Sequence, residues 1–210
     1  MTSLIVLHGF RQNGAHLHAH LGPLRARLPE SLQIHVPDGT RTCSPASLAR
    51  LAPMLGRDNP EPHLCWWDAT DDGSQYRGYE ASRELLHTLL ERAARPRGIL
   101  GFSQGAGLAA IAAALARRGE FPALDFVVLA AGRKPRATAL APLFDTPVTL
   151  PSLHVMGTRD PSLPYSERLA VCFAAELCEV ARWDGPHVLP TRGIGADAIV
   201  EFVTRQLTGP

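Results

Sequence analysis

The sequence predicts an α/β fold, with a mostly parallel central sheet and helices on both of its faces. Two observations support this class. Short, nearly continuous apolar segments alternate along the chain with longer segments of helical periodicity, an order typical of parallel strands joined by helices. The length of 210 residues is also sufficient for one sizeable core. We therefore expect a single domain over residues 1–210.

Six segments are expected to form the strands, most of them short apolar runs. The first lies at the N-terminus, the second is stopped by Pro37-Asp38-Gly39, and the third follows Pro96. In chain order the expected strands are Leu4–Leu7, Gln33–Val36, Ile99–Phe102, Phe126–Ala130, Leu153–Met156 and Cys178–Trp183.

Five longer segments are expected to form helices. The first ends before Pro29, and the second places four leucines between residues 85 and 90 on one face. The third closes at Arg117-Arg118-Gly119, where basic residues and a glycine are typical of a helix C-terminus. In chain order the expected helices are Asn13–Leu28, Gly78–Ala94, Ala106–Leu115, Tyr165–Ala175 and Ala196–Leu207.

Residues 38–78 depart from this alternation. They contain several prolines and glycines and the pair Trp66-Trp67. About forty residues without periodicity in a compact domain are usually functional or disordered, and the tryptophans together with Tyr76 argue against disorder. We interpret the segment as an insertion over the carboxyl edge of the sheet that shapes a substrate pocket. The alternative is a surface excursion whose tryptophans fill the core.

The overall charge argues against two classes of partner. With a net charge of +1, the chain has no basic surplus for binding nucleic acid or an anionic membrane surface. No apolar segment approaches the ~20 residues that span a bilayer. The first residues lack the basic start and the small-residue cleavage site of a signal peptide. We therefore expect neither a membrane span nor a signal peptide.

The cysteines and histidines do not indicate disulfides or a metal site. The four cysteines show no C-x-x-C spacing, so unpaired thiols and a cytoplasmic location are expected. Of His16-x-His18-x-His20, only His16 and His20 would share a helix face, and no cysteine or carboxylate follows at ligand spacing. We expect a solvated helix face there, and neither a metal nor an organic cofactor.

A serine stands between two glycines where a strand meets a helix. The segment Gly101-Phe102-Ser103-Gln104-Gly105 follows an apolar run and precedes an alanine-rich one. In a Gly-x-Ser-x-Gly turn of this kind, the glycines leave room for a strained backbone and the serine hydroxyl stands at the helix N-terminus. We interpret Ser103 as a nucleophile. The alternative is a purely structural turn.

Such a serine needs a base, and the base needs an orienting acid. In α/β folds with such a serine, the three residues follow one another along the chain in the order Ser, acid, His. Asp160 follows the fifth expected strand, and His187 follows the sixth on a Gly-Pro loop, so both fit this order. Both should lie at the carboxyl edge of the sheet, where open α/β sheets bind ligands. Three other acids are less well placed: Asp184 is too close to His187 along the chain, Asp125 precedes a strand, and Asp145 lies in a proline-flanked segment.

Negative charge on a reacting carbonyl oxygen requires two backbone N–H donors. One is expected from Gln104, directly after the nucleophile. The other is expected from the loop after the first strand, where His8-Gly9-Phe10-Arg11 has the position of an H-G-containing loop. Phe10 is the preferred donor and Arg11 the next. The alternative is that Gly9 only permits a sharp turn.

Four segments together resemble the FSH-type family of small α/β-hydrolase serine hydrolases, which includes thioesterases that release polyketide acyl chains. They are Leu7–Gly14, Gly101–Ala106, Gly157–Asp160 and Gly185–His187, so the likeness spans nearly the whole chain. The resemblance implies an α/β-hydrolase fold with the nucleophile at Ser103, the acid at Asp160 and the base at His187. The chain departs from the family at Pro186, where the family often has glycine, and proline fixes φ and removes a donor.

These residues predict hydrolysis of a carboxylic ester or thioester of a small to medium acyl group through an acyl-serine intermediate. The expected partner is a small-molecule acyl ester or thioester. Two alternatives remain open: a thioesterase for acyl-carrier, coenzyme A or acyl-protein substrates, and a catalytically silent module that binds a small ligand. Loop position suggests a substrate pocket that includes Phe10, Arg11, Trp66, Trp67 and Leu163.

Overall fold

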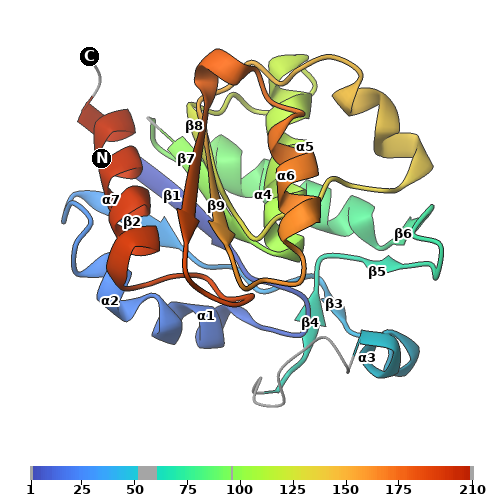
Figure 1. Ribbon diagram of the computed structural model, residues 1–210. Coiled ribbons are helices and arrows are strands. Elements are labelled where there is room, and N and C mark those ends of the chain that lie inside the picture. The colour runs from blue at the N-terminus through green and yellow to red at the C-terminus, as the bar shows by residue number, and fades with distance from the viewer. Residues whose placement is uncertain (1, 52–60, 96, 209–210) are drawn as a thin grey trace.

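The computed structural model describes residues 2–51, 61–95 and 97–208 (Figure 1). At its centre these residues form a six-stranded sheet. Neighbouring strands follow the order β10-β9-β8-β7-β1-β2, and every pairing is parallel. All six expected strands are present, which confirms the predicted sheet. Their bounds are β1 (Thr2–Leu7), β2 (Leu32–His35), β7 (Arg97–Phe102), β8 (Phe126–Ala130), β9 (Ser152–Gly157) and β10 (Cys178–Trp183).

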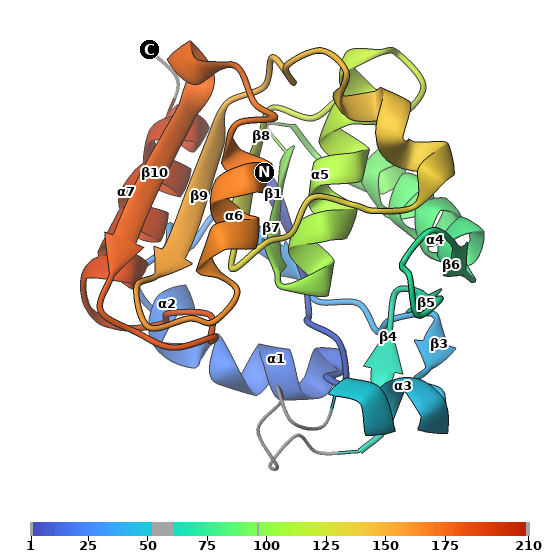
Figure 2. The same cartoon turned by 45° about the vertical axis from the view of Figure 1, so that its right-hand side comes forward.

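Helices cover both faces of the sheet (Figure 2). Because successive strand residues point to opposite faces, Ile5 packs into one core with α4, α5 and α6, whereas Leu4 packs into a second core with α1, α2 and α7. The helices are α1 (Gly14–His20), α2 (Gly22–Arg25), α3 (Pro45–Leu51), α4 (Tyr79–Arg92), α5 (Gln104–Arg117), α6 (Leu163–Ala170) and α7 (Gly193–Thr208), with 3-10 turns η2 (Thr138–Phe144) and η3 (Ala175–Leu177).

Two expected helices were wrong in extent. The helix expected over Asn13–Leu28 is interrupted at Leu21, because Pro23, in the first turn of α2, cannot donate to the preceding turn, and α2 ends at Arg25. The helix expected over Tyr165–Ala175 ends at Ala170, because the chain beyond it bonds to Val148 instead. No helix within the described ranges combines the length and the apolar character that a membrane crossing requires.

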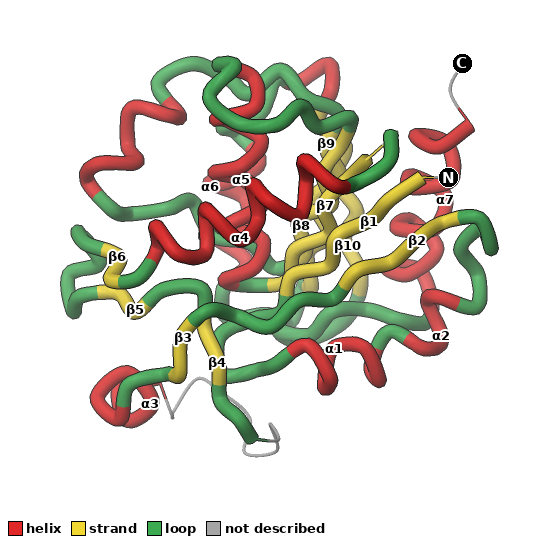
Figure 3. The backbone as a smooth tube through the Cα atoms, turned by 180° about the vertical axis from the view of Figure 1, so that it is seen from behind, coloured by secondary structure: helices red, strands yellow, loops and turns green. Residues whose placement is uncertain are grey.

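The segment 38–78 carries short elements of its own (Figure 3). Strand β3 (Arg41–Thr42) pairs antiparallel with β4 (Leu64–Cys65), and β5 (Asp68–Ala69) pairs antiparallel with β6 (Tyr76–Arg77). The expectation of an insertion here also includes residues 52–60, which lie outside the described residues. In the described part, β4 is tied to the loop after β1, because Arg11 N donates to Leu64 O at 2.9 Å. This loop stands at the carboxyl edge of the sheet.

The order of the strands reverses between β1 and β7. From β1 the chain moves outward to the edge strand β2, and then returns to β7 on the other side of β1. The connections that follow β1 and β7 therefore run in opposite directions along the sheet. Open α/β sheets bind ligands at points where neighbouring connections diverge in this way. The loop after β1 and the turn after β7 therefore flank the position where this topology favours a binding site.

Candidate active site

Ser103 occupies a sharp turn between β7 and α5. Its φ of 53° and ψ of −110° lie outside the usual regions for a residue with a side chain, and its N–H donates to Ala130 O at 2.9 Å. A Cβ on Gly101 would overlap the first turn of α5, and a Cβ on Gly105 would overlap the backbone at the end of β1. The two glycines therefore allow the close backbone contacts that present the serine at the helix N-terminus.

The structure brings Ser103, His187 and Asp160 together in one chain of hydrogen bonds. His187 Nε2 lies 3.0 Å from Ser103 Oγ, and His187 Nδ1 lies 2.7 Å from Asp160 Oδ2. The loops that carry the acid and the imidazole are also joined through their backbones, because Arg159 N donates to Gly185 O at 3.0 Å. With Pro186 in place, the loop still directs His187 toward the serine.

The carboxylate of Asp160 is buried and fully hydrogen-bonded. Burial opposes its ionisation, but the hydrogen bonds from His187 and Ser162 outweigh burial, so the pKa of Asp160 is lowered. The N–H and the hydroxyl of Ser162 both donate to Oδ1 at 2.7 Å. An ionised Asp160 accepts from Nδ1–H of His187 and leaves Nε2 as an acceptor for the serine hydroxyl.

The three alternative acids lie elsewhere. Asp184 has a side chain that is 82% exposed and pairs with Arg159 at 2.8 Å. Asp125 precedes β8 and accepts from Arg97 N at 2.8 Å, at the opposite edge of the sheet. Asp145 follows η2 and lines a surface groove. None of the three is hydrogen-bonded to His187 in the part of the chain that the structure describes.

The hydrogen bonds of the loop after β1 determine which of its N–H groups could act as the second oxyanion donor. Arg11 N–H is taken by Leu64 O, so Arg11 is not available as the second oxyanion donor. Gly9 N–H is taken by the Gln12 side chain at 2.9 Å. The backbone N–H groups of Phe10 and Gln104 have no hydrogen-bond partner among the described residues. They stand on adjacent segments, because the first turn of α5 packs directly against the end of β1.

His8 links this loop by a hydrogen bond to the segment that follows β2. Its ring is fully buried and accepts from Gly39 N at Nε2, at 2.8 Å. Nδ1 lies 2.8 Å from Gly9 O, so Nδ1 carries the proton and the ring is neutral. Burial lowers the pKa of His8 and favours this neutral form. The sequence interpretation treated His8 only as part of the loop motif.

The two tryptophans are core residues in the structure. Trp66 is fully buried and donates from Nε1 to His8 O at 2.8 Å. Trp67 is 6% exposed and stacks on Tyr76 at 4.5 Å between ring centroids. The Gln104 side chain holds both, because it accepts from Trp66 N at 2.9 Å and donates to Trp67 O at 2.8 Å. These contacts favour the interpretation in which the tryptophans fill the core.

Three other residues were expected in a pocket, and of these Phe10 is half-buried on the loop after β1. Arg11 is 9% exposed and has a φ of 67°. Leu163 is half-buried at the start of α6, where its N–H donates to Asp160 O at 3.0 Å. Leu163 therefore lies beside the acid, and its position agrees with a place at the edge of the site.

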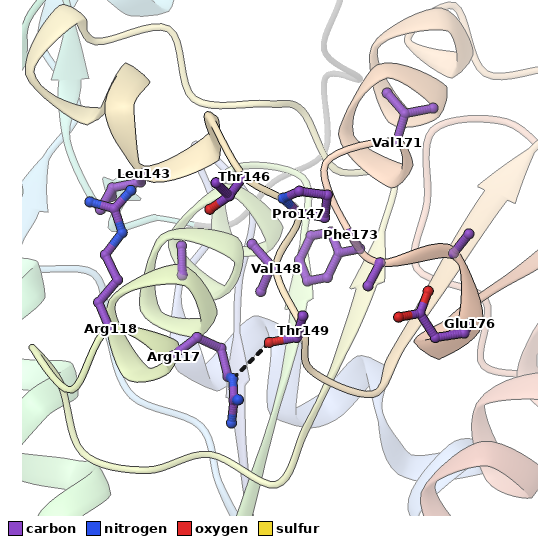
Figure 4. A pocket seen from close by; sticks show the side chains of 13 residues that line it. Arg117, Arg118, Leu143, Thr146, Pro147, Val148, Thr149, Val171, Phe173 and Glu176 are labelled. Atoms are coloured by element: carbon purple, nitrogen blue, oxygen red, sulfur yellow. Dashed lines mark hydrogen bonds between the residues drawn. The ribbon is translucent and has the colours of Figure 1, made fainter.

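A pocket of about 720 Å³ lies away from these residues (Figure 4). It is lined by the end of α5 and by the segments that lead into β9 and β10, which include Arg117, Thr149, Phe173 and Glu176. These positions belong to the amino edge of the sheet, whereas Ser103, Asp160 and His187 follow the carboxyl ends of their strands. The pocket takes no part in the candidate site.

Comparisons with known proteins concern the family and the fold of the chain. A sequence model of the family described as serine hydrolase (FSH1) matches residues 1–197. The chain is 30% identical to esterase OVCA2 of Bos taurus over 97% of this chain and 96% of the relative. It is 32% identical to esterase OVCA2 of Xenopus tropicalis, over 98% and 93%. The crystal structure of Zea mays acyl-protein thioesterase 2 superposes with a TM-score of 0.72 at 21% identity, over 98% of this chain and 94% of that one. This likeness confirms the α/β-hydrolase fold.

Proposed function

Because the chain belongs to the serine hydrolase (FSH1) family and is a hydrolase, we propose that it cleaves carboxylic esters or thioesters through an acyl-serine intermediate on Ser103. The observation that carries this proposal is the hydrogen-bonded chain from Ser103 Oγ through His187 to Asp160, at 3.0 and 2.7 Å. A catalytic triad is recognised by such geometry. The esterase names of the relatives support the same reaction.

In the first half of the proposed reaction, His187 Nε2 removes the hydroxyl proton of Ser103 while Oγ attacks the carbonyl carbon. The carbonyl oxygen becomes an anion, which the N–H groups of Phe10 and Gln104 stabilise. His187 then passes its proton to the departing alcohol or thiol, and the acyl group stays on the serine. Asp160 holds the imidazole in the required tautomer and stabilises its charged form.

In the second half, a water molecule takes the place of the leaving group. His187 removes a proton from the water, which attacks the acyl carbon, and the same proton returns to Ser103 Oγ as the acid departs. The same three residues and two N–H donors can act on oxygen esters and on thioesters, so the proposal includes both substrate classes. The fold shared with an acyl-protein thioesterase makes thioesters the second substrate class to test.

The test combines turnover with covalent labelling. Wild-type protein should hydrolyse p-nitrophenyl butyrate and should be labelled by a fluorophosphonate at Ser103, as located by mass spectrometry. Ser103→Ala should lose both, with turnover reduced by about 10³-fold or more. Ser31→Ala, at an exposed serine, is the matched control and should retain both. A wild-type protein that resists the probe would instead be a binding module without catalysis.

We also propose a cytoplasmic location. All four cysteines, Cys43, Cys65, Cys172 and Cys178, are free thiols in the structure. Free thiols persist in reducing compartments, which supports the proposal. Fractionation of cells that express the tagged protein would test it, and recovery in the secreted fraction would contradict it.

A further inference from the structure

A half-buried arginine lies on the loop that leaves β8. The guanidinium carbon of Arg133 stands 3.9 Å from the centroid of the Tyr165 ring, in the first turns of α6. Arg168 approaches the same ring at 5.9 Å. A guanidinium stacked on an aromatic ring is held in one plane, and the N–H groups at its edge stay available for a planar anion.

Backbone contacts connect each member of the stacked pair to the reacting residues. The carbonyl of Arg133 lies 3.5 Å from the position that a Cβ on Gly107 would take, and Gly107 N donates to Ser103 O at 3.2 Å. Tyr165 N donates to Ser162 O at 2.9 Å, and Ser162 Oγ lies 3.0 Å from His187 Nδ1. The two residues therefore belong to segments that neighbour the turn of Ser103 and the loop of Asp160, and we call this neighbourhood the rim of the candidate site.

The charge of Arg133 is not neutralised by a carboxylate. Within the described parts of the chain, Arg133 makes no ion pair, and the groups that act on its charge are Tyr165, Arg136 and Tyr76, none of which is a carboxylate. Burial lowers the pKa of the Arg133 guanidinium, although it stays protonated at neutral pH. A partly desolvated cation without a counter-ion is unfavourable. An anion bound at this rim would relieve that cost.

We propose that Arg133, held on the Tyr165 ring, binds an anionic group of the substrate and makes the enzyme selective for negatively charged acyl esters or thioesters. The inference rests on the proposed function. Two sources supply the same planar or tetrahedral oxyanion: a carboxylate at the far end of the acyl chain, or a phosphate in the leaving group of a coenzyme A type thioester. Both fit the fork of a guanidinium.

Two substrate pairs separate these sources. The first pair is p-nitrophenyl hydrogen glutarate and its neutral methyl ester, which differ only in the acyl carboxylate. The second pair is butyryl-coenzyme A and butyryl-N-acetylcysteamine, which differ in the phosphates of the leaving group. For each pair, the ratio of kcat/KM for the anionic to the neutral substrate is measured in wild type, Arg133→Gln, Arg133→Lys and Arg117→Gln. The last variant removes the same charge at the opposite edge of the sheet.

In one of the pairs, Arg133→Gln should lower this ratio roughly 10- to 100-fold, mainly through KM, because charge-assisted hydrogen bonds have this magnitude. Arg133→Lys should lower it severalfold, since lysine keeps the charge and loses the fork. Arg117→Gln should keep the wild-type ratio. If Arg133→Gln fails to fold, the ratio in Arg133→Lys decides.

Unchanged ratios in both pairs would overturn the proposal, as would an equal loss for both members of a pair, which would indicate packing. An equal decrease in Arg117→Gln would also overturn it, because net charge would then explain the preference. Failure of the proposed function looks different, because wild type would hydrolyse none of the neutral substrates.

Discussion

Ser162 decides how the carboxylate of Asp160 faces His187. Its N–H and its hydroxyl both bind Oδ1 at 2.7 Å, which leaves Oδ2 for His187 Nδ1. The hydroxyl also lies 3.0 Å from Nδ1, so it shares the space between acid and base. Because Ser162 acts through Asp160, it is a positioning residue for the proposed reaction.

Replacing Ser162 with alanine should lower kcat for a p-nitrophenyl ester about 3- to 10-fold, because one hydrogen bond to the carboxylate is lost while the backbone bond remains. KM should stay within about twofold, since the hydroxyl is hydrogen-bonded to the acid. Steady-state kinetics at saturating and limiting substrate measure both quantities. Ser162→Thr keeps a hydroxyl and should restore most of kcat. A change confined to KM would show that Ser162 has another role.

The order of motifs predicted that Ser103, Asp160 and His187 would follow strand ends, and parallel strands bring such ends to one edge. Their catalytic roles stay predictions. The role of Ser162 was not foreseen, although Asp-x-Ser is a known signal for a side chain that caps its own turn. The bond that occupies Arg11 N–H depends on β4, some fifty residues further along the chain. No local pattern in the sequence reports such a contact.

Gln104 joins two elements that are far apart in the sequence. It opens α5, and its side-chain amide bridges the backbones of Trp66 and Trp67 beside β4. The amide uses its oxygen to accept and its nitrogen to donate, so both functions of the side chain are needed. Through this bridge, the segment after β4 is fixed to the turn that carries Ser103.

Gln104→Glu should loosen this segment, because a carboxylate still accepts from Trp66 N–H but cannot donate to Trp67 O. A buried carbonyl without its donor costs about 1–3 kcal/mol of unfolding free energy. Urea unfolding measures that loss, and hydrogen exchange should show faster exchange over residues 64–69. Gln75→Glu makes the same chemical change at an exposed position of the same segment and is the matched control. Equal exchange in wild type and Gln104→Glu would contradict the bridge.

For the molecule as a whole, alternation of apolar and helical segments was enough to predict the sheet and the layers, because both faces of the strands are buried. The short strand pairs β3–β4 and β5–β6 were not predicted from the sequence. Each strand has two residues, which is too short for an alternating pattern, and β4 also pairs with the loop after β1, a distant contact that no local pattern indicates. Periodicity also missed the break at Pro23, although proline is itself a local signal.

Two buried histidines link the stability of the fold to pH. His8 is fully buried, and His154 in β9 is 1% exposed. Burial lowers the pKa of both, that of His154 from 6.5 to about 4. His154 packs edge-on against Phe173, and its Nε2 has no hydrogen-bond partner among the described residues. Burial outweighs the Gly9 carbonyl and the Asp38 carboxylate, which favour a charged His8, and burial alone lowers the pKa of His154, so both rings are neutral in the folded protein at neutral pH.

Acidification should therefore destabilise the protein below pH 6.5. There the unfolded chain takes up protons at these histidines while the folded chain does not, so stability is greatest above pH 6.5 and falls until the folded pKa is reached. For His154 alone, the loss between pH 8 and pH 5 is about 2 kcal/mol. His154→Leu should remove this part of the difference between urea unfolding free energies at the two pH values. Met156→Leu, a buried neighbour in the same strand, should keep the full difference. An undiminished difference in His154→Leu would mean that His154 binds its proton equally well in the folded and unfolded chains.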